Sequence, residues 1–454
     1  MRLKNHLTLI LALVLTISIL PQKKAFTIDD LYKIKGVGAP VLSNSGERIA
    51  FTVSESDLAK GKSSSSLYVM NTNGSSLVDI TEKLPGANSP FWSANDELYV
   101  MVGGQLHKYN LNTGESKQIT DFYAGVSDPV VSNDGKYVAF TAELFPECGT
   151  DNDCNKKLDE SSSNGPVQAY IADELLFRHW TEYKGEKETY LVLFDTQTKT
   201  YQTIVSSDVL SGTYMLGGGP KYAFSPDSRV LSYVATQEKN IANSTNTDIY
   251  LLPLGGKDAV NITVANNAWD GGVVFSPDGK YLAYRTHLIP GFEADRFRVA
   301  VYNTQTLQNE VLTESFDFTT DDISWSSDSK SIYFTANAQG YNPVYKVDVQ
   351  TKNVLKVTDD KSVAGYQLSK DEKTLYLTFS SVDKPREIYS YCDARSAGTD
   401  PESTPGPAVV RGMPRRRLRN LLEYRIPWTG AGGWMGSCQP WGRWRSIHPV
   451  LPAG

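Results

Sequence analysis

The chain has 454 residues, of which 45 are Lys or Arg, 51 are Asp or Glu and 40% are hydrophobic. This is the balance of an ordinary globular protein, and 35 Gly and 22 Pro are too few for a collagen-like or generally disordered chain. The formal net charge of -6 argues against nucleic-acid binding, because a protein that neutralises phosphates needs a basic surface. We therefore expect a large buried core and no nucleic-acid partner.

The N-terminus has the pattern of a targeting segment. Arg2 and Lys4 precede an apolar stretch, Leu7 to Leu20, that has the length of a secretory apolar region and is short for a membrane span. Residues 1–25 are predicted to be a cleaved signal peptide or an uncleaved N-terminal anchor, since Lys23 stands where cleavage favours a small residue. No other membrane span is expected. The chain is therefore predicted to be exported, either to the periplasm or out of the cell.

A repeated phrase organises residues 27–391. It consists of an apolar or aromatic residue, a serine, turn residues and then alternating apolar positions, as in Phe275-Ser-Pro-Asp-Gly-Lys280 and the strand after it. Its serines stand at positions 43, 93, 132, 225, 276, 326 and 369. Their spacings of 50, 39, 93, 51, 50 and 43 residues match the period of a four-stranded propeller blade except once. The sequence therefore predicts an all-β, seven-bladed β-propeller of WD40/TolB-like repeats with one insertion, and structural turn aspartates.

The long spacing reflects an insertion at residues 143–188, in the third repeat. Cys148 and Cys154 lie within it, separated by five residues, and an exported chain meets an oxidising compartment, so we expect a short-loop disulfide. Two reduced thiols are the alternative. No second Cys or His pair stands nearby, so the sequence predicts no metal site and no cofactor.

The phrase around Phe275 to Lys280, with a threonine closing each repeat, resembles the repeats of TolB-like propellers and of the N-terminal propellers of the prolyl oligopeptidase (S9) family of serine peptidases. The opening Thr27 to Ser43 and the insertion motifs Phe145-Pro-Glu-Cys148 and Leu176-Phe-Arg-His-Trp180 are similar to those of bacterial exported dipeptidyl and acylaminoacyl peptidases. This resemblance implies a propeller that works beside a catalytic domain in proteolysis.

The resemblance also implies candidate residues on the substrate side of the propeller. An insertion of this kind faces the substrate cleft in the related enzymes and holds the N-terminal amine of the peptide. The candidates here are Glu174, Arg178 and His179. The alternative is a short helix that packs apolar side chains against the blade, namely Leu175, Leu176 and Trp180.

The catalytic motif of these peptidases is absent from the sequence. No serine stands in a Gly-x-Ser-x-Gly nucleophile elbow, and among the five histidines only His448 lies in the region where the catalytic histidine is expected. Only 63 residues follow Tyr391, far fewer than an α/β-hydrolase domain needs. We therefore expect no catalytic residue and no activity from the chain as written.

Residues 392–454 differ from the rest in composition. They hold nine Arg and no Lys, four of the eight Trp and eight of the 22 Pro, and they lack strand or helix periodicity. Translation in a wrong reading frame, a genuine disordered basic tail and a small separate module are the three interpretations. The fourth strand of blade seven should begin near residue 395, where no strand pattern is found, so an exposed sheet edge is expected.

Three functions from different classes fit this sequence. The first is the substrate-gating propeller of an exported dipeptidyl or acylaminoacyl peptidase, separated from its α/β-hydrolase domain. The second is a stand-alone periplasmic TolB-like propeller that binds proteins. The third, an enzyme with its site in the propeller channel, is disfavoured because no carboxylates or histidines recur on matching strands. In the first two, the propeller face binds a peptide substrate or a protein partner.

Overall fold

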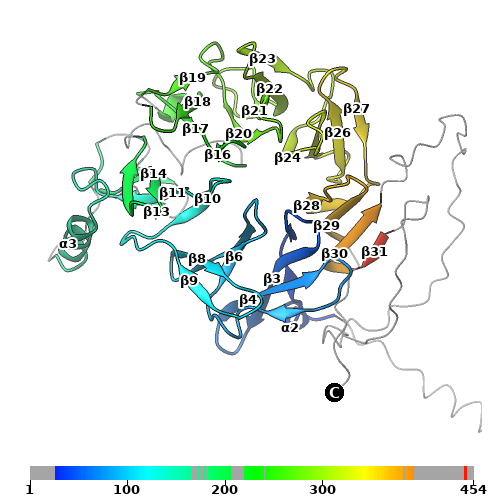
Figure 1. The fold of residues 1–454 in the computed structure, drawn as a ribbon, viewed down its shortest axis with the longest axis horizontal. Coiled ribbons are helices and arrows are strands. Elements are labelled where there is room, and N and C mark those ends of the chain that lie inside the picture. The colour runs from blue at the N-terminus through cyan, green and yellow to red at the C-terminus, as the bar shows by residue number, and fades with distance from the viewer. Residues whose placement is uncertain are drawn as a thin grey trace, which may run out of the picture.

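Seven antiparallel sheets surround a common axis in the computed structural model of the chain (Figure 1). The structure describes residues 26–165, 169, 171–173, 175, 177–179, 182–183, 185–205, 219–239, 241–256, 258–381, 384–392 and 444–446. Each sheet is one blade, and its strands follow one another in chain order from the axis outward. The predicted all-β, seven-bladed propeller is confirmed.

The first three blades lie between residues 36 and 203. Blade 1 contains β1 (Gly36–Val37), β2 (Val41–Leu42), β3 (Arg48–Asp57), β4 (Lys62–Asn71) and β5 (Val78–Asp79). Blade 2 contains β6 (Asn88–Trp92), β7 (Leu98–Val102), β8 (Gln105–Tyr109) and β9 (Ser116–Gln118). Blade 3 contains β10 (Ser127–Val131), β11 (Tyr137–Leu144), β14 (Glu188–Asp195) and β15 (Thr200–Thr203). In blade 1, β1 and β2 both pair with β3 and share the innermost position.

The other four blades complete the ring. Blade 4 contains β16 (Tyr222–Phe224), β17 (Val230–Ala235), β18 (Asp248–Pro253) and β19 (Val260–Asn261). Blade 5 contains β20 (Asp270–Phe275), β21 (Tyr281–Thr286), β22 (Arg298–Asn303) and β23 (Gln308–Val311). Blade 6 contains β24 (Thr320–Trp325), β25 (Ser331–Ala336), β26 (Val344–Asp348) and β27 (Val354–Lys356). Blade 7 contains β28 (Ser362–Leu368), β29 (Thr374–Ser381), β30 (Lys384–Cys392) and β31 (Trp444–Ser446).

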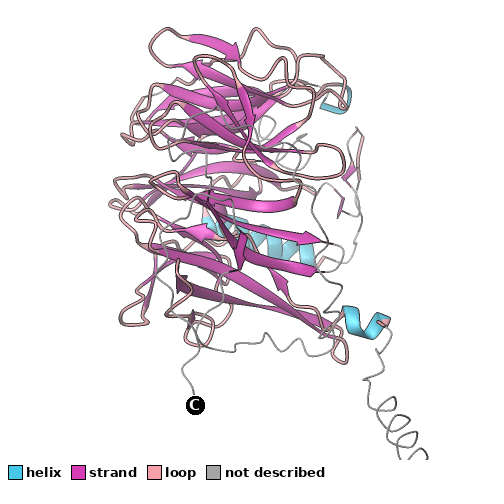
Figure 2. Ribbon diagram, turned by 90° about the vertical axis from the view of Figure 1, so that its right-hand side faces the viewer, coloured by secondary structure: helices cyan, strands magenta, loops and turns pink. Residues whose placement is uncertain are grey.

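A few elements lie outside the blades. They are α2 (Ile28–Leu31), η1 (Ile241–Asn243), and, in the insertion between β11 and β14, α3 (Asn152–Ser163) with the strand pair β12 (Arg178–His179) and β13 (Glu182–Tyr183). The edge-on view in Figure 2 shows α2 and η1 on the same side of the disc. The additions to the propeller therefore mark one of its two faces.

The repeated phrase forms the turn between the first two strands of a blade. In blade 5 the Ser276 hydroxyl donates to Asp278 at 2.8 Å and accepts the backbone N–H of Tyr281 at 3.0 Å, while Gly279 takes a φ of 71°. Ser329 stands at the glycine position in blade 6 with a φ of 61°, and its hydroxyl accepts the backbone N–H of Asp278 at 3.2 Å. The turn aspartates are thus structural, as predicted, because they satisfy the backbone of their own turns.

The threonine that closes the repeat also has a structural role. The Thr313 hydroxyl accepts the backbone N–H of Val299 at 2.9 Å, at the start of the third strand of blade 5. Thr263 and Thr358 make the same bond in blades 4 and 6, at 2.9 and 3.0 Å. This bond fixes the link to the next blade where the outermost strand ends.

The hydrophobic core lies between blades and not within them. One cluster joins Val299 and Val301 of blade 5 to Phe334 and Tyr345 of blade 6, and comparable clusters join the other neighbours. Each fully buried side chain of this size contributes about 1.5–3 kcal/mol relative to exposure to water. A single blade has no core of its own, so the closed ring is the stable unit.

The ring closes by packing between blades 1 and 7. Ile388 of β30 joins the buried cluster of Ile49, Phe51 and Met70, and no strand is exchanged between the two blades in the part of the chain that the structure describes. The expectation that blade 7 lacks its fourth strand is wrong, because β31 pairs with Tyr389 to Tyr391 of β30. Strand pairing needs an extended backbone and not a periodic sequence, so the pattern of the tail gave no sign of it.

Candidate functional site

The connections between strands alternate between the two faces of the ring. Because the strands of a blade are antiparallel, the repeated turns lie on one face, while the links from second to third strand and from blade to blade lie on the other. The insertion, residues 145–187, is a link of the second kind. We call this second face, which also carries the 287–297 link of blade 5, the insertion face.

Exposed apolar side chains gather on the insertion face. Those in links of the blades and in the insertion are Leu58, Tyr123, Ile171, Leu175, Phe177, Tyr183, Val264, Leu288, Ile289, Phe292 and Tyr341. Among the exposed large apolar residues of the described chain, only Leu307 lies in a turn of the opposite face. Such an imbalance is typical of a surface that contacts another molecule.

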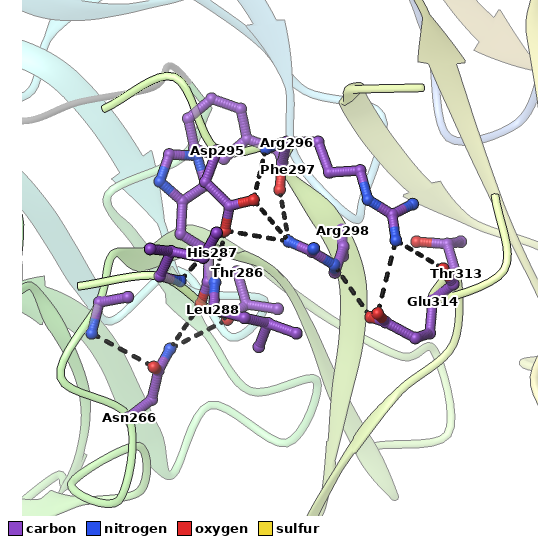
Figure 3. Close-up of polar contacts among 12 residues, drawn as sticks. Asn266, Thr286, His287, Leu288, Asp295, Arg296, Phe297, Arg298, Thr313 and Glu314 are labelled. Carbon is purple, nitrogen blue, oxygen red and sulfur yellow. Dashed lines mark hydrogen bonds and ion pairs between the residues drawn. The ribbon is translucent and has the colours of Figure 1, made fainter. Parts of the chain in front are cut away.

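The link that carries Leu288, Ile289 and Phe292 is held by a buried carboxylate. Asp295, 8% exposed, accepts the backbone N–H groups of Leu288 at 2.7 Å and Ile289 at 3.2 Å (Figure 3). It also pairs with Arg298 at 3.1 Å. Burial alone would raise the pKa of Asp295, but the Leu288 N–H and the Arg298 guanidinium more than offset it and lower the pKa. The carboxylate is therefore charged and keeps the apolar link in one conformation.

The same network reaches the link to blade 6. Arg298 Nε lies 2.9 Å from a carboxylate oxygen of Glu314, and Arg296 donates to the Glu314 carbonyl at 2.6 Å and to the carbonyl of Phe316 (Figure 3). Gly291 donates its N–H to Thr245 in the neighbouring link of blade 4 at 3.0 Å. The insertion face of blades 4 to 6 is therefore cross-linked by polar contacts.

A buried cation lies closer to the axis. The Arg285 side chain is 3% exposed and its Nη1 lies 2.8 Å from an oxygen of Asp321, whose side chain is 52% exposed. Its guanidinium carbon lies 4.9 Å from the ring centre of Phe297 and 5.6 Å from that of Trp269. The attraction of the guanidinium to the two aromatic rings and to the carboxylate offsets the cost of removing this cation from water. The exposed half of Asp321 on β24 remains accessible to a polar or cationic group.

Two further titratable groups are buried beside this cation. Burial raises the pKa of Asp270 to about 7, although Asn266 Nδ2 donates to both carboxylate oxygens at 3.1 Å. His287 is fully buried, its ring centre lies 4.0 Å from that of Phe297, and neither ring nitrogen has a hydrogen-bond partner. Burial lowers the pKa of His287, so its imidazole is neutral. These groups are part of the core and do not face a substrate.

The histidines and the metal-ligating residue types of the described part of the chain do not form clusters. Neither nitrogen of His287 has a hydrogen-bond partner, and neither has the Nδ1 of His107, in the part of the chain that the structure describes. The same residues contain no group of three His, Cys, Asp or Glu side chains able to hold a metal ion. The insertion face presents exposed apolar side chains on a hydrogen-bonded link and the half-exposed carboxylate of Asp321.

The insertion residues predicted from the sequence are only partly described. Glu174 lies outside the described residues, and nothing is described of the His179 side chain. Arg178 is exposed and lies in β12, opposite Tyr183 of β13. The alternative of a short helix packed on the blade is wrong at Arg178 and His179, which form a strand, and Leu175 is 66% exposed. The grouping of Glu174, Arg178 and His179 on the substrate side therefore stays a prediction.

The base of the insertion is firmly attached to blade 3. Cys148 and Cys154, the pair expected to bond, are joined by a disulfide with their Cα atoms 5.4 Å apart. Asn155, which is buried, accepts the Phe145 N–H at 3.0 Å, and the Asp151 side chain accepts the Cys154 N–H at the start of α3. Because both ends of this short loop are fixed, the insertion leaves blade 3 in a defined direction.

Sequence reasoning missed the charged groups of blade 5. Arg285 stands nine residues after its repeat serine, Ser276, where the six other repeats have smaller uncharged residues, namely Thr52, Val102, Thr141, Val234, Thr335 and Thr378. Aligning the repeats on their serines would have singled it out. No comparable signal exists for Asp295 and Arg298, because the 287–297 link has no counterpart in the repeat.

These features define a seven-bladed β-propeller whose insertion face carries most of the exposed apolar side chains of its links and turns. No protein-family model matches the chain. The chain is 26% identical over 335 residues to dipeptidyl-peptidase 5 of Porphyromonas gingivalis, a match that covers 71% of this chain and 48% of the relative. It therefore spans about half the length of that curated relative.

Solved structures share the propeller. The acylaminoacyl peptidase of Pyrococcus horikoshii superposes with a TM-score of 0.59 and 13% identity, over 79% of this chain and 51% of the other. The β-propeller domain of the trilobed protease from Pyrococcus furiosus, described as having an open velcro topology, superposes with a TM-score of 0.54 and 12% identity, over 79% and 93%. The resemblance to the propellers of prolyl oligopeptidase-type peptidases, predicted from the sequence, is confirmed by these matches.

Proposed function

We propose that this chain is the substrate-gating propeller of an exported serine peptidase of the dipeptidyl or acylaminoacyl type, and that alone it hydrolyses no peptide. The observation that carries the proposal is the insertion face, where apolar side chains are held out to solvent on a rigid frame. Leu288, Ile289 and Phe292 are 42%, 49% and 49% exposed although Asp295 holds their backbone in place. A preorganised apolar surface of this kind suits a folded partner domain.

The length of the relative supports the same proposal. The P. gingivalis dipeptidyl-peptidase extends over about twice the matched portion, since the match covers 48% of it. A domain of that size would cover the insertion face of blades 3 to 6 and confine a peptide between itself and the ring. Asp321 is the side chain we propose to face a peptide there, because its carboxylate is anchored by Arg285 and half exposed.

Export fits the chemistry of the chain. The basic and apolar N-terminal segment is a secretory pattern, and the Cys148–Cys154 disulfide is stable in an oxidising compartment such as the periplasm. Among the described residues, no helix is long and apolar enough to cross a membrane.

Two measurements test the proposal. The purified chain is incubated with dipeptidyl and N-acylaminoacyl p-nitroanilides and with a fluorophosphonate probe for activated serines, and we expect neither turnover nor labelling. The gene is then resequenced from codon 380 through 454 and beyond, with all three frames read. A shifted frame that encodes a Gly-x-Ser-x-Gly motif downstream is the expected result. If no frame encodes it and the stop codon holds, the peptidase proposal is wrong.

The second candidate is a stand-alone periplasmic, TolB-like binding propeller. It is favoured by one observation, the completion of blade 7 by β31, which leaves the ring with four strands in its last sheet. A pull-down from periplasmic extract separates the two candidates when the chain is compared with the variant Ile289→Asp, Phe292→Asp. Recovery of a partner that is not a hydrolase, lost in the variant, would favour the binding protein.

A further inference from the structure

The short helix α2 has its polar side turned inward. Asp30 is 3% exposed and accepts hydrogen bonds from the Thr27 backbone N–H at 3.0 Å and hydroxyl at 2.9 Å, and it pairs with Lys33 at 2.7 Å. Positions 28, 31 and 32 are spaced so that they share one side of a helical turn. That side is apolar and exposed, since Ile28 is 73%, Leu31 55% and Tyr32 43% exposed. A helix on a globular domain normally buries this side.

The exposed side of α2 is part of a wider apolar patch. Phe26, 53% exposed, precedes the helix, and Leu58, 54% exposed, lies in the link between β3 and β4. The chain after α2 runs along the same hairpin, because β1 pairs with β3 and Lys35 forms an ion pair with Glu55. The patch lies at blade 1 of the insertion face, whereas the 287–297 link of the proposed partner interface lies at blade 5 of the same face, across the ring (Figure 1).

The sequence before α2 indicates what covers this patch. The apolar stretch Leu7 to Leu20 ends eight residues before Ile28. Eight extended residues span at most about 29 Å. If the stretch inserts into a bilayer, α2 therefore lies close to the membrane surface.

The charge of the segment fits the same surface. Residues 21–35 hold Lys23, Lys24, Lys33 and Lys35 against Asp29 and Asp30. Lys33 is paired with Asp30 and Lys35 with Glu55, so the excess of positive charge comes from Lys23 and Lys24, which precede the described residues. Lysines near an apolar helix side attract anionic lipid headgroups, and aromatic residues such as Phe26 and Tyr32 favour the boundary between headgroups and acyl chains. We infer that α2 and its flanks form a membrane-surface contact that binds anionic phospholipid and holds the propeller against the bilayer.

Hydrogen exchange with vesicles tests this inference. The full chain is mixed with vesicles of phosphatidylglycerol and phosphatidylcholine, and with phosphatidylcholine alone, and amide exchange of residues 26–35 is followed. We expect exchange to slow about tenfold with the anionic vesicles and much less with the neutral ones. Flotation alone does not discriminate, because the stretch Leu7 to Leu20 can itself bind lipid.

Matched variants separate α2 from the apolar stretch. Ile28→Ser, Leu31→Ser should abolish the protection of residues 26–35, because about tenfold or more of the partition coefficient is lost with these two side chains. Val260→Ser, at a residue 59% exposed on β19 of blade 4, should leave the protection unchanged. Unchanged near-UV circular dichroism shows that each variant is folded.

Three results would overturn the inference. The chain floats with vesicles while exchange at residues 26–35 does not change, which means that α2 stays in water. The double variant is protected as strongly as the wild type. The segment becomes protected without lipid as protein concentration rises, which means that the patch binds a second copy of the chain and not a membrane.

Discussion

Replacing Asp270 by asparagine is expected to stabilise the propeller at neutral pH and to have little effect below about pH 4. Asp270 is 1% exposed, and burial raises its pKa from 3.8 to about 7. Its partner Asn266 donates one amide group to both carboxylate oxygens at 3.1 Å. Asparagine keeps the carbonyl oxygen that accepts this bond and carries no charge, so it resembles the protonated acid.

The sign and size follow from proton linkage. Between pH 3.8 and about 7 the unfolded chain loses the Asp270 proton while the folded chain keeps it, so stability falls as pH rises. A shift of roughly three units at about 1.4 kcal/mol per unit gives a cost of about 4 kcal/mol above pH 7. The difference in unfolding free energy between Asp270→Asn and the wild type should therefore grow by about 4 kcal/mol from pH 4 to pH 8.

Urea unfolding followed by tryptophan emission at pH 4, 5, 6, 7 and 8 measures this difference. Asp278→Asn is the matched control, because its hydrogen bonds with the Lys280 N–H and Ser276 outweigh burial and lower its pKa. The Asp278 carboxylate stabilises the fold at pH values above its pKa in the unfolded chain, and this stabilisation is lost as pH falls. Asp278→Asn should therefore lower the unfolding free energy most at high pH. A flat difference for Asp270→Asn across the series would show that this carboxyl is already ionised in the fold.

Three other substitutions probe the insertion face and the core behind it. His287→Phe should stabilise the fold by about 1 kcal/mol at pH 7, because it removes two buried nitrogens that have no hydrogen-bond partner. The gain should grow as pH falls below about 6.5, because burial lowers the pKa of His287 and only the unfolded chain then takes up the proton. Thermal melting of the variant and the wild type at pH 5 and pH 7 measures both effects. Cys148→Ala, Cys154→Ala should cost about 2 kcal/mol and speed proteolysis of the insertion, and equal cleavage rates would contradict the anchoring role. Asp295→Ala should cost about 2–3 kcal/mol, because Arg298 keeps Glu314 but loses its second carboxylate partner and the Leu288 and Ile289 N–H groups lose their acceptor; a melting shift worth under about 1 kcal/mol would refute this.

The blades could be predicted because each turn is encoded locally. Within six residues, Ser276 bonds to Asp278 and to the Tyr281 N–H, so the serine, the aspartate and the glycine between strands leave a pattern that repeats along the chain. Counting that pattern yields seven blades, and the alternating apolar positions assign the faces that pack between them.

The candidate binding face could not be predicted in the same way. Arg285 and Asp321 are 36 residues apart and meet only because β21 and β24 lie in adjacent blades. Asp295 acts on the backbone of Leu288, and any residue type there would offer the same N–H. A contact to a backbone N–H depends on where the residue lies and not on its type, so the sequence does not indicate it.

By itself, the sequence determined the number of blades, the place of the insertion and the cysteines that bond, because each depends on spacing within a short segment. Only the tertiary structure decided that β31 completes the last sheet, that apolar side chains collect on the insertion face, and that α2 buries Asp30 while exposing Ile28. The physical reason is that burial and strand pairing depend on residues brought together from different blades. A pattern of apolar and polar residues shows that an element has two different sides, but it does not show which side faces the core.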